Sequence, residues 1–233
     1  MSLQASLAQL YNNYYFREGL GPDPYERTEP WLSFFAAVAD RISLDIGPES
    51  ALDVGCATGM LVEALRAHEI DARGFDLSVY ALSQMPVEVA KHCWPGEAQD
   101  PMSYADRQYD LITCVEVVEH LPEAAAQYAI GLMCQHTRTI LFSSSPTDFT
   151  EPTHINVHGP EYWAEQFARF SFLRDLDFDV AFLSPWAALY RLTDMPLHRV
   201  VFKYERELWE RLQQNHTQRA QILTMQKELG NAG

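Results

Sequence analysis

Short, strongly apolar runs alternate with segments of helical pattern through the middle of the sequence. The apolar runs at residues 51–54, 72–75, 109–115 and 139–142 have the length of buried strands, and helical spacing fills the intervals between them. Strands and helices that alternate in this way form βαβ units, whose right-handed crossovers produce a parallel sheet. The sequence therefore predicts an α/β fold that binds its ligand at the carboxyl ends of the strands.

Three regions are predicted along the 233 residues of the chain. Residues 1–45 are expected to form an N-terminal helical lid, residues 46–195 the core, and residues 196–233 a long C-terminal helix. Residues 172–192 alternate in polarity and contain Pro185, which suits a hairpin at the edge of the sheet.

The C-terminal helix is charged, and its apolar residues have mixed spacing. Two interpretations stay open: the helix lies on the surface of the core, or it pairs with a partner helix in a coiled coil. Asn215 and His216 interrupt the heptads that a coiled coil needs. The second interpretation predicts a homodimer, or a partner protein bound through this helix.

Charge and cysteine content argue against several classes of function. The chain carries 32 Asp and Glu against 17 Lys and Arg, whereas a protein that binds nucleic acid through its phosphates needs a cationic face. The four cysteines include no C-x-x-C pair, so neither a disulfide framework nor a zinc site is expected. No segment has the roughly 18–20 apolar residues of a membrane span. We therefore expect a cytoplasmic protein whose substrate is not a nucleic acid.

A glycine loop, Asp53-Val54-Gly55-Cys56-Ala57-Thr58-Gly59, follows the first strand and opens a helix. It lacks the middle glycine of the dinucleotide pattern G-x-G-x-x-G, in which the backbone approaches a pyrophosphate. The carboxylate of Asp53 would repel a phosphate and attract a positively charged group. These two features disfavour an NAD-dependent oxidoreductase.

A second acid, Asp76, ends the next strand 21 residues after Gly55. From this position an acidic side chain reaches the hydroxyls of a ribose. The loop and Asp76 together predict a ligand with a ribose, no phosphates and a cationic amino-acid end. S-adenosylmethionine has this chemistry.

Three segments carry a family resemblance: ALDVGCATGMLVEAL at residues 51–65, RGFDLS at 73–78 and YDLITCVEVVEHLP at 109–122. They resemble the motifs of class I S-adenosylmethionine-dependent methyltransferases, and the resemblance covers roughly residues 46–192. It implies an enzyme with a Rossmann-like, seven-stranded, mostly parallel sheet whose last strand is antiparallel.

The resemblance also implies which residues bind the cofactor. The methionine end would lie at the glycine loop, the ribose at Asp76, and the adenine between Leu77 and Asp100. The cofactor-binding residues expected in this way are Asp53, Gly55, Cys56, Gly59, Asp76, Leu77, Asp100 and Glu116. In similar enzymes the N-terminal lid covers the pocket, so Arg27 is a candidate partner for the cofactor carboxylate, and Tyr14, Tyr15 and Tyr25 are candidates to close over it. Packing of the lid on the core is the alternative role for these tyrosines.

Acidic and histidine side chains follow the predicted fourth and fifth strands. Glu116, Glu119 and His120 are spaced to share one face of a helical turn, and His154 or His158 can add a further ligand. Carboxylates and imidazoles of this kind suit Mg²⁺ or another divalent cation. The sequence thus predicts a metal site of Glu116, Glu119, His120 and His154. A metal-free base role for His120 or His154, and a structural role, stay open.

The Glu-x-x-Glu-His pattern resembles two groups of methyltransferases. One comprises the O-methyltransferases of ubiquinone biosynthesis, and the other methylates the terminal 2′-hydroxyl of small RNAs. The second group is disfavoured because its later histidine motif is missing and the net charge is -15. We therefore expect a small polar acceptor, with a hydroxyl of a sugar, a glycan or an aromatic diol as the methylated group. The alternative is a non-catalytic, cofactor-binding or scaffolding subunit that docks a partner through the C-terminal helix.

Overall fold

The computed structural model describes residues 10–19 and 24–231. The chain divides into two compact units, Met1–Leu192 and Thr193–Gly233. The division falls three residues before the predicted start of the C-terminal helical region. Residues 29–45, expected to belong to a lid, lie in the same unit as the sheet.

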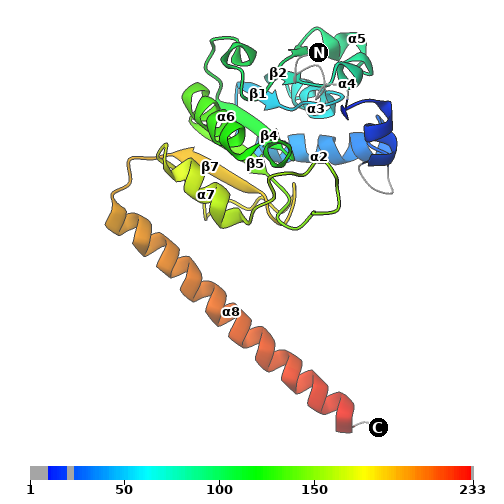
Figure 1. Ribbon diagram of the computed structural model, residues 1–233. Helices are drawn as coiled ribbons and strands as arrows, with labels where there is room; N and C mark the ends of the chain where they lie inside the picture. The colour runs from blue at the N-terminus through cyan, green and yellow to red at the C-terminus, as the bar shows by residue number, and fades with distance from the viewer. Residues whose placement is uncertain (1–9, 20–23, 232–233) are drawn as a thin grey trace. The chain divides into compact units, whose positions relative to one another are not determined.

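The larger unit is built on one seven-stranded sheet (Figure 1). Its strands lie in the order β3-β2-β1-β4-β5-β7-β6, and β7 runs antiparallel to both of its neighbours. The other neighbouring strands pair in parallel. The strands are β1 (Ser50–Val54), β2 (Asp71–Asp76), β3 (Cys93–Pro95), β4 (Leu111–Val115), β5 (Thr139–Ser143), β6 (Phe172–Arg174) and β7 (Ala188–Leu192). The predicted Rossmann-like, mostly parallel sheet with an antiparallel β7 is confirmed.

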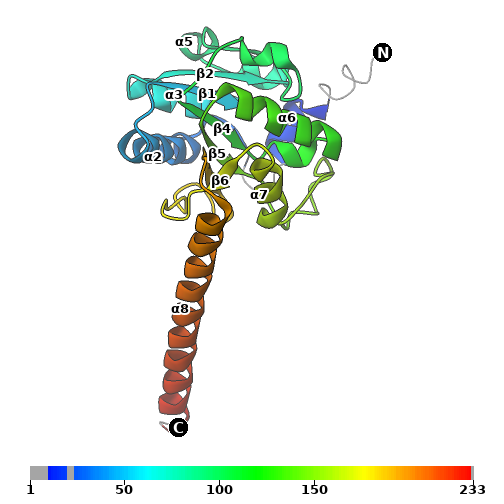
Figure 2. The ribbon, with the colours of Figure 1, turned by 90° about the vertical axis from the view of Figure 1, so that its left-hand side faces the viewer.

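Helices cover both faces of this sheet (Figure 2). One core cluster unites α2 (Glu29–Asp45) and α3 (Met60–Ala67) with one face, and a second unites α6 (Glu123–His136) and α7 (Pro160–Ala168) with the other. The shorter helices are α4 (Val79–Ser83), α5 (Val87–Ala90), the π-helix η1 (Tyr15–Gly19), and the 3₁₀-helices η2 (Pro101–Tyr104) and η3 (Val118–His120). Because β1, β4 and β5 are covered on both sides, their residues are almost all buried, as in other parallel sheets.

The turn after β1 depends on glycine. Gly55 has φ of 77°, in the left-handed region where a side chain is strained. A Cβ atom there would lie 2.5 Å from Cγ2 of Val117. The amides of Gly55 and Cys56 both donate to the carbonyl oxygen of Phe75, at 3.0 Å each. This turn therefore joins the end of β1 tightly to the end of β2.

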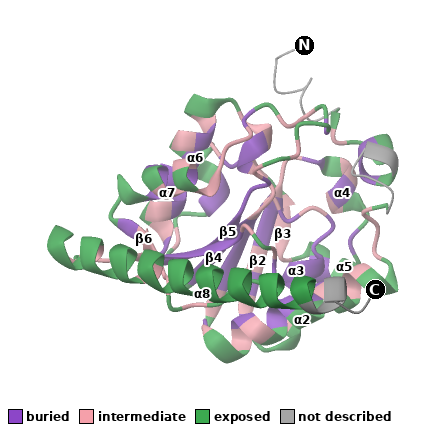
Figure 3. Cartoon of the chain, turned by 90° about the horizontal axis from the view of Figure 1, so that it is seen from below, coloured by how far each residue is buried: buried purple, intermediate pink, exposed green. Residues whose placement is uncertain are grey.

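The second unit contains α8 (Leu197–Asn231), a helix of 35 residues. Figure 3 colours it green over nearly its whole length, and none of its side chains described from Leu197 to Lys227 is buried. Among the described residues, no helix combines the length and apolar character needed to cross a membrane.

Candidate functional site

A cavity of about 970 Å³ lies at the carboxyl ends of β1, β2, β4 and β5. Its volume is near the upper end of the roughly 300–1,000 Å³ that ligand pockets span. The site residues predicted from the sequence that line it are Asp53, Gly55, Cys56, Asp76, Leu77, Glu116, His120 and His154. The structure thus brings most of the predicted cofactor residues and both predicted catalytic histidines to one cavity.

Asp53 is the buried acid at the end of β1. Its Oδ1 accepts a hydrogen bond of 2.6 Å from the hydroxyl of Thr113, its register partner on β4. Burial raises the pKa of Asp53 to about 7, against a lowering by Thr113 and with a further increase from Asp76. A cation beside a carboxyl group with this pKa stabilises the ionised form and lowers the pKa, so the cation and the carboxylate favour each other.

Asp76 joins the two loops at the ends of β1 and β2. Its Oδ2 accepts from the amide of Ala57 at 2.7 Å, and its Oδ1 accepts from the amide of Ser78 at 2.7 Å. Burial raises the pKa of Asp76, while these two amides lower it. Each carboxylate oxygen has a second lone pair, so a fixed acceptor remains for the hydroxyls of a ligand.

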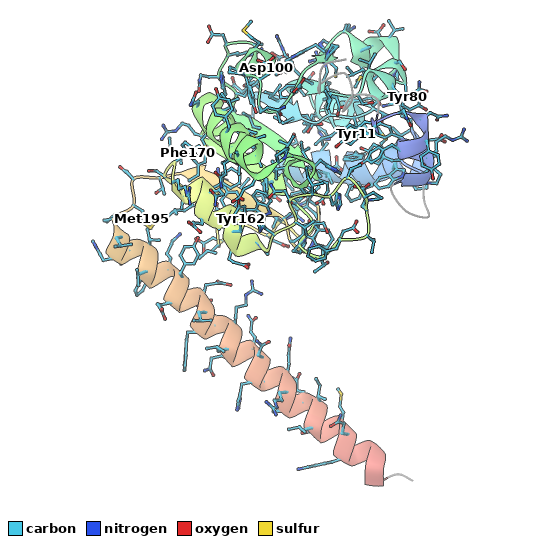
Figure 4. All side chains as sticks on the ribbon, in the orientation of Figure 1. Tyr11, Tyr80, Asp100, Tyr162, Phe170 and Met195 are labelled. Atoms are coloured by element: carbon cyan, nitrogen blue, oxygen red, sulfur yellow. The ribbon has the colours of Figure 1, made fainter. Side chains whose placement is uncertain are left out.

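Two predicted cofactor residues lie elsewhere. Gly59 has φ of 71° at the N-cap of α3, where a Cβ atom would meet Val89 at 2.8 Å, so it serves the packing of α5. Asp100 is exposed, and its carboxylate caps η2 by accepting from the amide of Met102 at 2.9 Å. Figure 4 labels Asp100 near the upper edge of the unit. The described residues that line the cavity in this segment are Gly96 to Gln99, and the assignment of Asp100, the next residue, to the adenine stays a prediction.

Glu116 lies beside Glu119 but is not one of the three residues whose potential ligand atoms converge. It has φ of 53°, and only Val118–His120 form a 3₁₀-helix, so Glu116, Glu119 and His120 do not share a helical turn. The Glu116 carboxylate accepts from the Ser143 hydroxyl at 2.7 Å, the Ser145 amide at 2.8 Å and Nε1 of Trp186 at 2.9 Å. Its three donors show that Glu116 is an anchor between the ends of β4 and β5 and the β6–β7 connection.

Glu119, His120 and His154 do converge. One potential ligand atom from each lies within 4.8 Å of the others. Glu119 is fully buried, and its pKa is raised by burial and by the adjacent carboxyl of Glu116. Its Oε2 accepts no hydrogen bond from the described residues. Three of the four side chains predicted as metal ligands thus lie together, Glu116 is not in this group, and the metal site stays a prediction.

Hydrogen bonds assign the tautomers of the two histidines. The Thr153 hydroxyl donates to Glu151 at 2.5 Å, so Nδ1 of His120, 2.8 Å from the same hydroxyl, is the donor in that contact. Nδ1 of His154 lies 2.9 Å from the carbonyl oxygen of Asp148, and it must donate as well. In the neutral form, each Nε2 then carries a lone pair.

The pKa of His120 is lowered to about 4 by burial and by His154, although Glu151 opposes this shift. His120 is therefore neutral at physiological pH, and its free nitrogen can accept a proton or bind a metal. His158, the other candidate ligand, instead contacts Asn156 at 3.0 Å and stacks on Tyr162.

Aromatic side chains form a wall of the cavity beside His120. They come from the N-terminal segment and α2: Tyr11, Tyr15, Phe16, Tyr25, Trp31, Phe34 and Phe35. Tyr11 and Tyr15 meet the His120 ring edge to face, with centroids 5.8 and 6.3 Å apart, and burial raises the pKa of Tyr11 to about 12.

The lid residues differ in their roles. Tyr15 and Tyr25 line the cavity, whereas Tyr14 is 67% exposed. Arg27 donates to the carbonyl oxygen of Thr58 at 3.0 Å and forms an ion pair with Glu63. Its guanidinium thus fastens the lid to the glycine loop and α3, and the predicted pairing with a cofactor carboxylate has to compete with these contacts.

The fold and this site define a class I S-adenosylmethionine-dependent methyltransferase. Residues 25–175 match a family described as a methyltransferase domain, and the chain belongs to that family. Among curated relatives, a ubiquinone biosynthesis O-methyltransferase from Methylococcus capsulatus is 28% identical over 158 residues, which cover 59% of this chain and 60% of the relative. The protein of the same name from Pseudomonas savastanoi pv. phaseolicola is 32% identical over 94 residues, 38% of this chain. The chain spans only 40% of the length of that relative.

Solved structures agree on the fold. A magnesium protoporphyrin IX methyltransferase from Synechocystis with bound S-adenosylmethionine superposes with a TM-score of 0.56 at 13% identity, covering 80% of this chain and 94% of that one. A methyltransferase from Archaeoglobus fulgidus gives 0.53 at 23% identity, covering 62% and 70%. At these identities the likeness extends to the fold alone.

The residues of the cavity fit S-adenosylmethionine. Asp53 offers a buried carboxyl to a cationic end, and Asp76 offers fixed acceptors to a ribose. Leu77, Ala98 and Val117 supply apolar surface for a base. When bound, the cofactor supplies an electrophilic methyl group.

Proposed function

We propose that the protein methylates a hydroxyl of a small acceptor, with an aromatic diol as the preferred class and a sugar or glycan hydroxyl as the second. The observation that carries this proposal is the convergence of Glu119, His120 and His154, because the two histidines of this group line a cavity that is also lined by aromatic rings. A hydroxyl is a weak nucleophile, so its proton must be managed in the reaction. The name of the relatives, ubiquinone biosynthesis O-methyltransferase, supports methyl transfer to oxygen.

The aromatic wall supports a planar acceptor. Tyr11 and Tyr15 lie beside His120, so a ring stacked on this wall would present its hydroxyls to the histidine cluster. Aromatic pairs gain about 0.5–1.5 kcal/mol beyond the burial of their area, which favours a ring over an open chain. A diol also has two neighbouring hydroxyls, which can contact both acceptor atoms, Nε2 of His120 and Nε2 of His154, whereas a lone hydroxyl contacts only one.

The cluster offers two ways to handle the proton. In the first, Nε2 of His120 accepts it, while Glu151 and Thr153 keep the imidazole in the required tautomer and orientation. In the second, Glu119, His120 and His154 hold a divalent cation, which would supply Lewis acidity toward the acceptor hydroxyls. The donor set of one carboxylate and two imidazoles supports the second way, because one potential ligand atom from each group lies within 4.8 Å of the others and Oε2 of Glu119 has no hydrogen-bond partner among the described residues.

Turnover with and without a chelator tests the proposal. We expect methylation of a catechol-type diol that is lost on chelation and restored by Mg²⁺ or another divalent cation. Calorimetric titration of that cation should show binding lost in Glu119→Gln and His154→Asn and retained in Glu97→Gln, a matched acid that lines the cavity outside the cluster. Transfer to amines or thiols, with none to diols or sugars, would refute the acceptor class. Unchanged turnover in chelator would refute the metal and leave His120 as the base.

A further inference from the structure

The cavity is lined by acidic side chains and, among the residues that the structure describes, by no lysine or arginine. The five acidic residues that line it are Asp53, Asp76, Glu97, Glu116 and Asp148. Residues 1–9 and 20–23, which lie outside the described ranges, contain no Lys or Arg in their sequence. Arg27 of the lid is held by Glu63 and by the carbonyl oxygen of Thr58. A cleft lined by charges of one sign focuses its field, so this cavity attracts cations and repels anions.

The cofactor accounts for only part of this charge. The two acids at the ends of β1 and β2 suit S-adenosylmethionine, whose cationic end and ribose they would contact. Glu116 and Asp148 lie instead on the segments that follow β4 and β5. Glu151 is buried nearby, with its Oε2 3.5 Å from Nε2 of His154 and 3.7 Å from Nδ1 of His120. The end of the cavity that would hold the acceptor therefore keeps negative charge that the cofactor does not offset.

A divalent cation at the histidine cluster would not reverse this balance. Each of the four acids at the acceptor end carries one negative charge when it is ionised, and the cation carries two positive ones; these acids are Glu116, Glu119, Asp148 and Glu151. Without a cation, burial and the carboxyl of Glu116 raise the pKa of Glu119, and counting Glu119 as protonated still leaves three negative charges. The acceptor end is therefore negative in both of the ways in which the cluster can handle the proton.

Asp148 is placed to meet the acceptor. It lines the cavity, its side chain is 41% exposed, and its main-chain carbonyl oxygen accepts from Nδ1 of His154 at 2.9 Å. The hydroxyl and the amide of Thr150 donate to its Oδ1 at 2.8 and 3.2 Å. The Thr150 hydroxyl is the main cause that lowers the pKa of Asp148 below its ordinary value, so the carboxyl group is ionised at physiological pH. Asp148 thus provides a fixed negative charge beside a histidine of the cluster.

The aromatic wall favours the same sign of charge. Tyr11 and Tyr15 line the cavity beside His120, and Tyr25 and Trp31 belong to the same wall. The face of an aromatic ring is electron-rich, so it attracts a cation and does not attract an anion. The carboxylates and the rings are separate features of the cavity, and both select a cation over an anion.

We propose that the methyl acceptor is a cationic diol, in which an ammonium group accompanies the hydroxyls, and that Asp148 selects for the ammonium. This inference rests on the proposed function and narrows its acceptor class. The ammonium serves recognition, and the methyl group still goes to a hydroxyl oxygen. Acceptors that carry a carboxylate or a phosphate are rejected, because the described lining offers no lysine or arginine to replace the water around the anion.

Three catechols of similar size test the charge selection: aminoethylcatechol is a cation at neutral pH, ethylcatechol is neutral, and carboxymethylcatechol is an anion. Calorimetry in the presence of S-adenosylhomocysteine gives their affinities, and steady-state kinetics with S-adenosylmethionine gives kcat/KM. We expect the cation to bind at least about tenfold more tightly than the anion, because several carboxylates act on each ligand. This ratio should fall as the salt concentration rises from about 0.01 to about 1 M, because salt screens the charges.

Asp148→Asn tests the assigned residue. Asparagine keeps the size of the side chain and an oxygen for the Thr150 donors, but it removes the charge. The preference for the cation over the anion should fall about two- to fivefold, as expected for a partly exposed ion pair. Asp106→Asn makes the same change at an exposed residue that does not line the cavity, and it should leave the preference unaltered. An unchanged preference in Asp148→Asn would overturn the role of this residue.

The outcomes separate this inference from the proposed function. Equal or tighter binding of carboxymethylcatechol would overturn the charge selection, even if all three catechols are methylated. Tighter binding of aminoethylcatechol without methyl transfer to its oxygen would refute the proposed function and leave the charge selection in place. If none of the three catechols binds, both are refuted. The salt dependence is measured on the unchanged chain, so it stays decisive if Asp148→Asn fails to fold.

Discussion

Replacing Gly55 by alanine tests the reasoning about the glycine loop. Its φ of 77° imposes a left-handed backbone, and the added Cβ would lie 2.5 Å from Cγ2 of Val117. Holding an alanine in the left-handed conformation costs about 1–2 kcal/mol of stability, which we call the backbone term. Overpacking against Val117 costs about 1–3 kcal/mol more. We therefore expect Gly55→Ala to reduce the free energy of unfolding by about 2–5 kcal/mol and to weaken binding of S-adenosylmethionine, because the loop must move from its place beside the cavity.

Gly47 supplies a matched control. Its φ is 61°, but a Cβ there would meet only the carbonyl oxygen of Ser43, at an ordinary 3.7 Å. Gly47→Ala should therefore lose only the backbone term of about 1–2 kcal/mol. The three heavy atoms nearest to the new Cβ at Gly55 all belong to Val117, so Val117→Ala should relieve the collision in the double variant.

Urea unfolding of the four chains of this cycle measures the coupling between Gly55 and Val117. The double variant should be more stable than the sum of the single changes predicts, by about the 1–3 kcal/mol assigned to overpacking. Calorimetry of the same chains should show cofactor affinity recovering with stability. A coupling near zero, or a Gly55→Ala loss no larger than that of Gly47→Ala, would refute the account.

Further predictions concern the charged groups of the cavity. Asp76→Ala should weaken S-adenosylmethionine binding by about ten- to a hundredfold in calorimetry, because charge-assisted hydrogen bonds are worth ~1.5–3 kcal/mol; unchanged affinity would contradict the ribose assignment. The pKa of Asp53 is about 7 in the folded chain against an ordinary 3.8, so the folded state holds the proton longer and this group lowers stability as pH rises from about 4 to 7. Asp53→Asn should remove that decline from urea unfolding measured across the same pH range. Binding of the cationic cofactor near pH 6.5 should release a proton from Asp53, visible as a binding heat that depends on the buffer. Trp186→Phe removes one donor to Glu116 and should shift acceptor KM more than cofactor affinity, as measured by steady-state kinetics and calorimetry.

The sheet was predictable because buried parallel strands produce continuous apolar runs. Four of the strands match those runs, although the fourth begins at Leu111 rather than at residue 109, since Tyr109 makes only an isolated bridge to Thr137. The three residues of β3, Cys93–Pro95, carry no such run and were accessible only through family resemblance. These three residues form a strand because they pair with Gly74–Asp76 of β2, and the local sequence of β3 does not indicate that pairing.

The part of the site next to the ends of strands was predictable, whereas the part formed by the loop after β5 was not. Asp53 and Asp76 lie beside glycine and turn signals that fix their places. Glu151 and Thr153, which orient His120, lie in a loop without hydrophobic periodicity. Their closeness to His154 in the sequence was the only indication in that loop that they contribute to the site.

The aromatic wall was predicted only in part, because Tyr15 and Tyr25 were candidates to close over the pocket and the rings of α2 were not. The periodicity of Trp31, Phe34 and Phe35 indicates that one face of α2 is covered, but it does not distinguish a core from a ligand cavity. The true arrangement places these rings at the cavity as well as in the core packing.

The segment that carries His154 is attached to the turn after β4 through main chain. The amides of Ile155 and Asn156 both donate to the carbonyl oxygen of Glu119, at 3.0 and 2.9 Å. The spacing between the two imidazoles is thus set by a backbone clamp and not by the imidazoles themselves. Exchanging His120 or His154 for another side chain should therefore leave the distance between these two segments unchanged, because main-chain hydrogen bonds hold it.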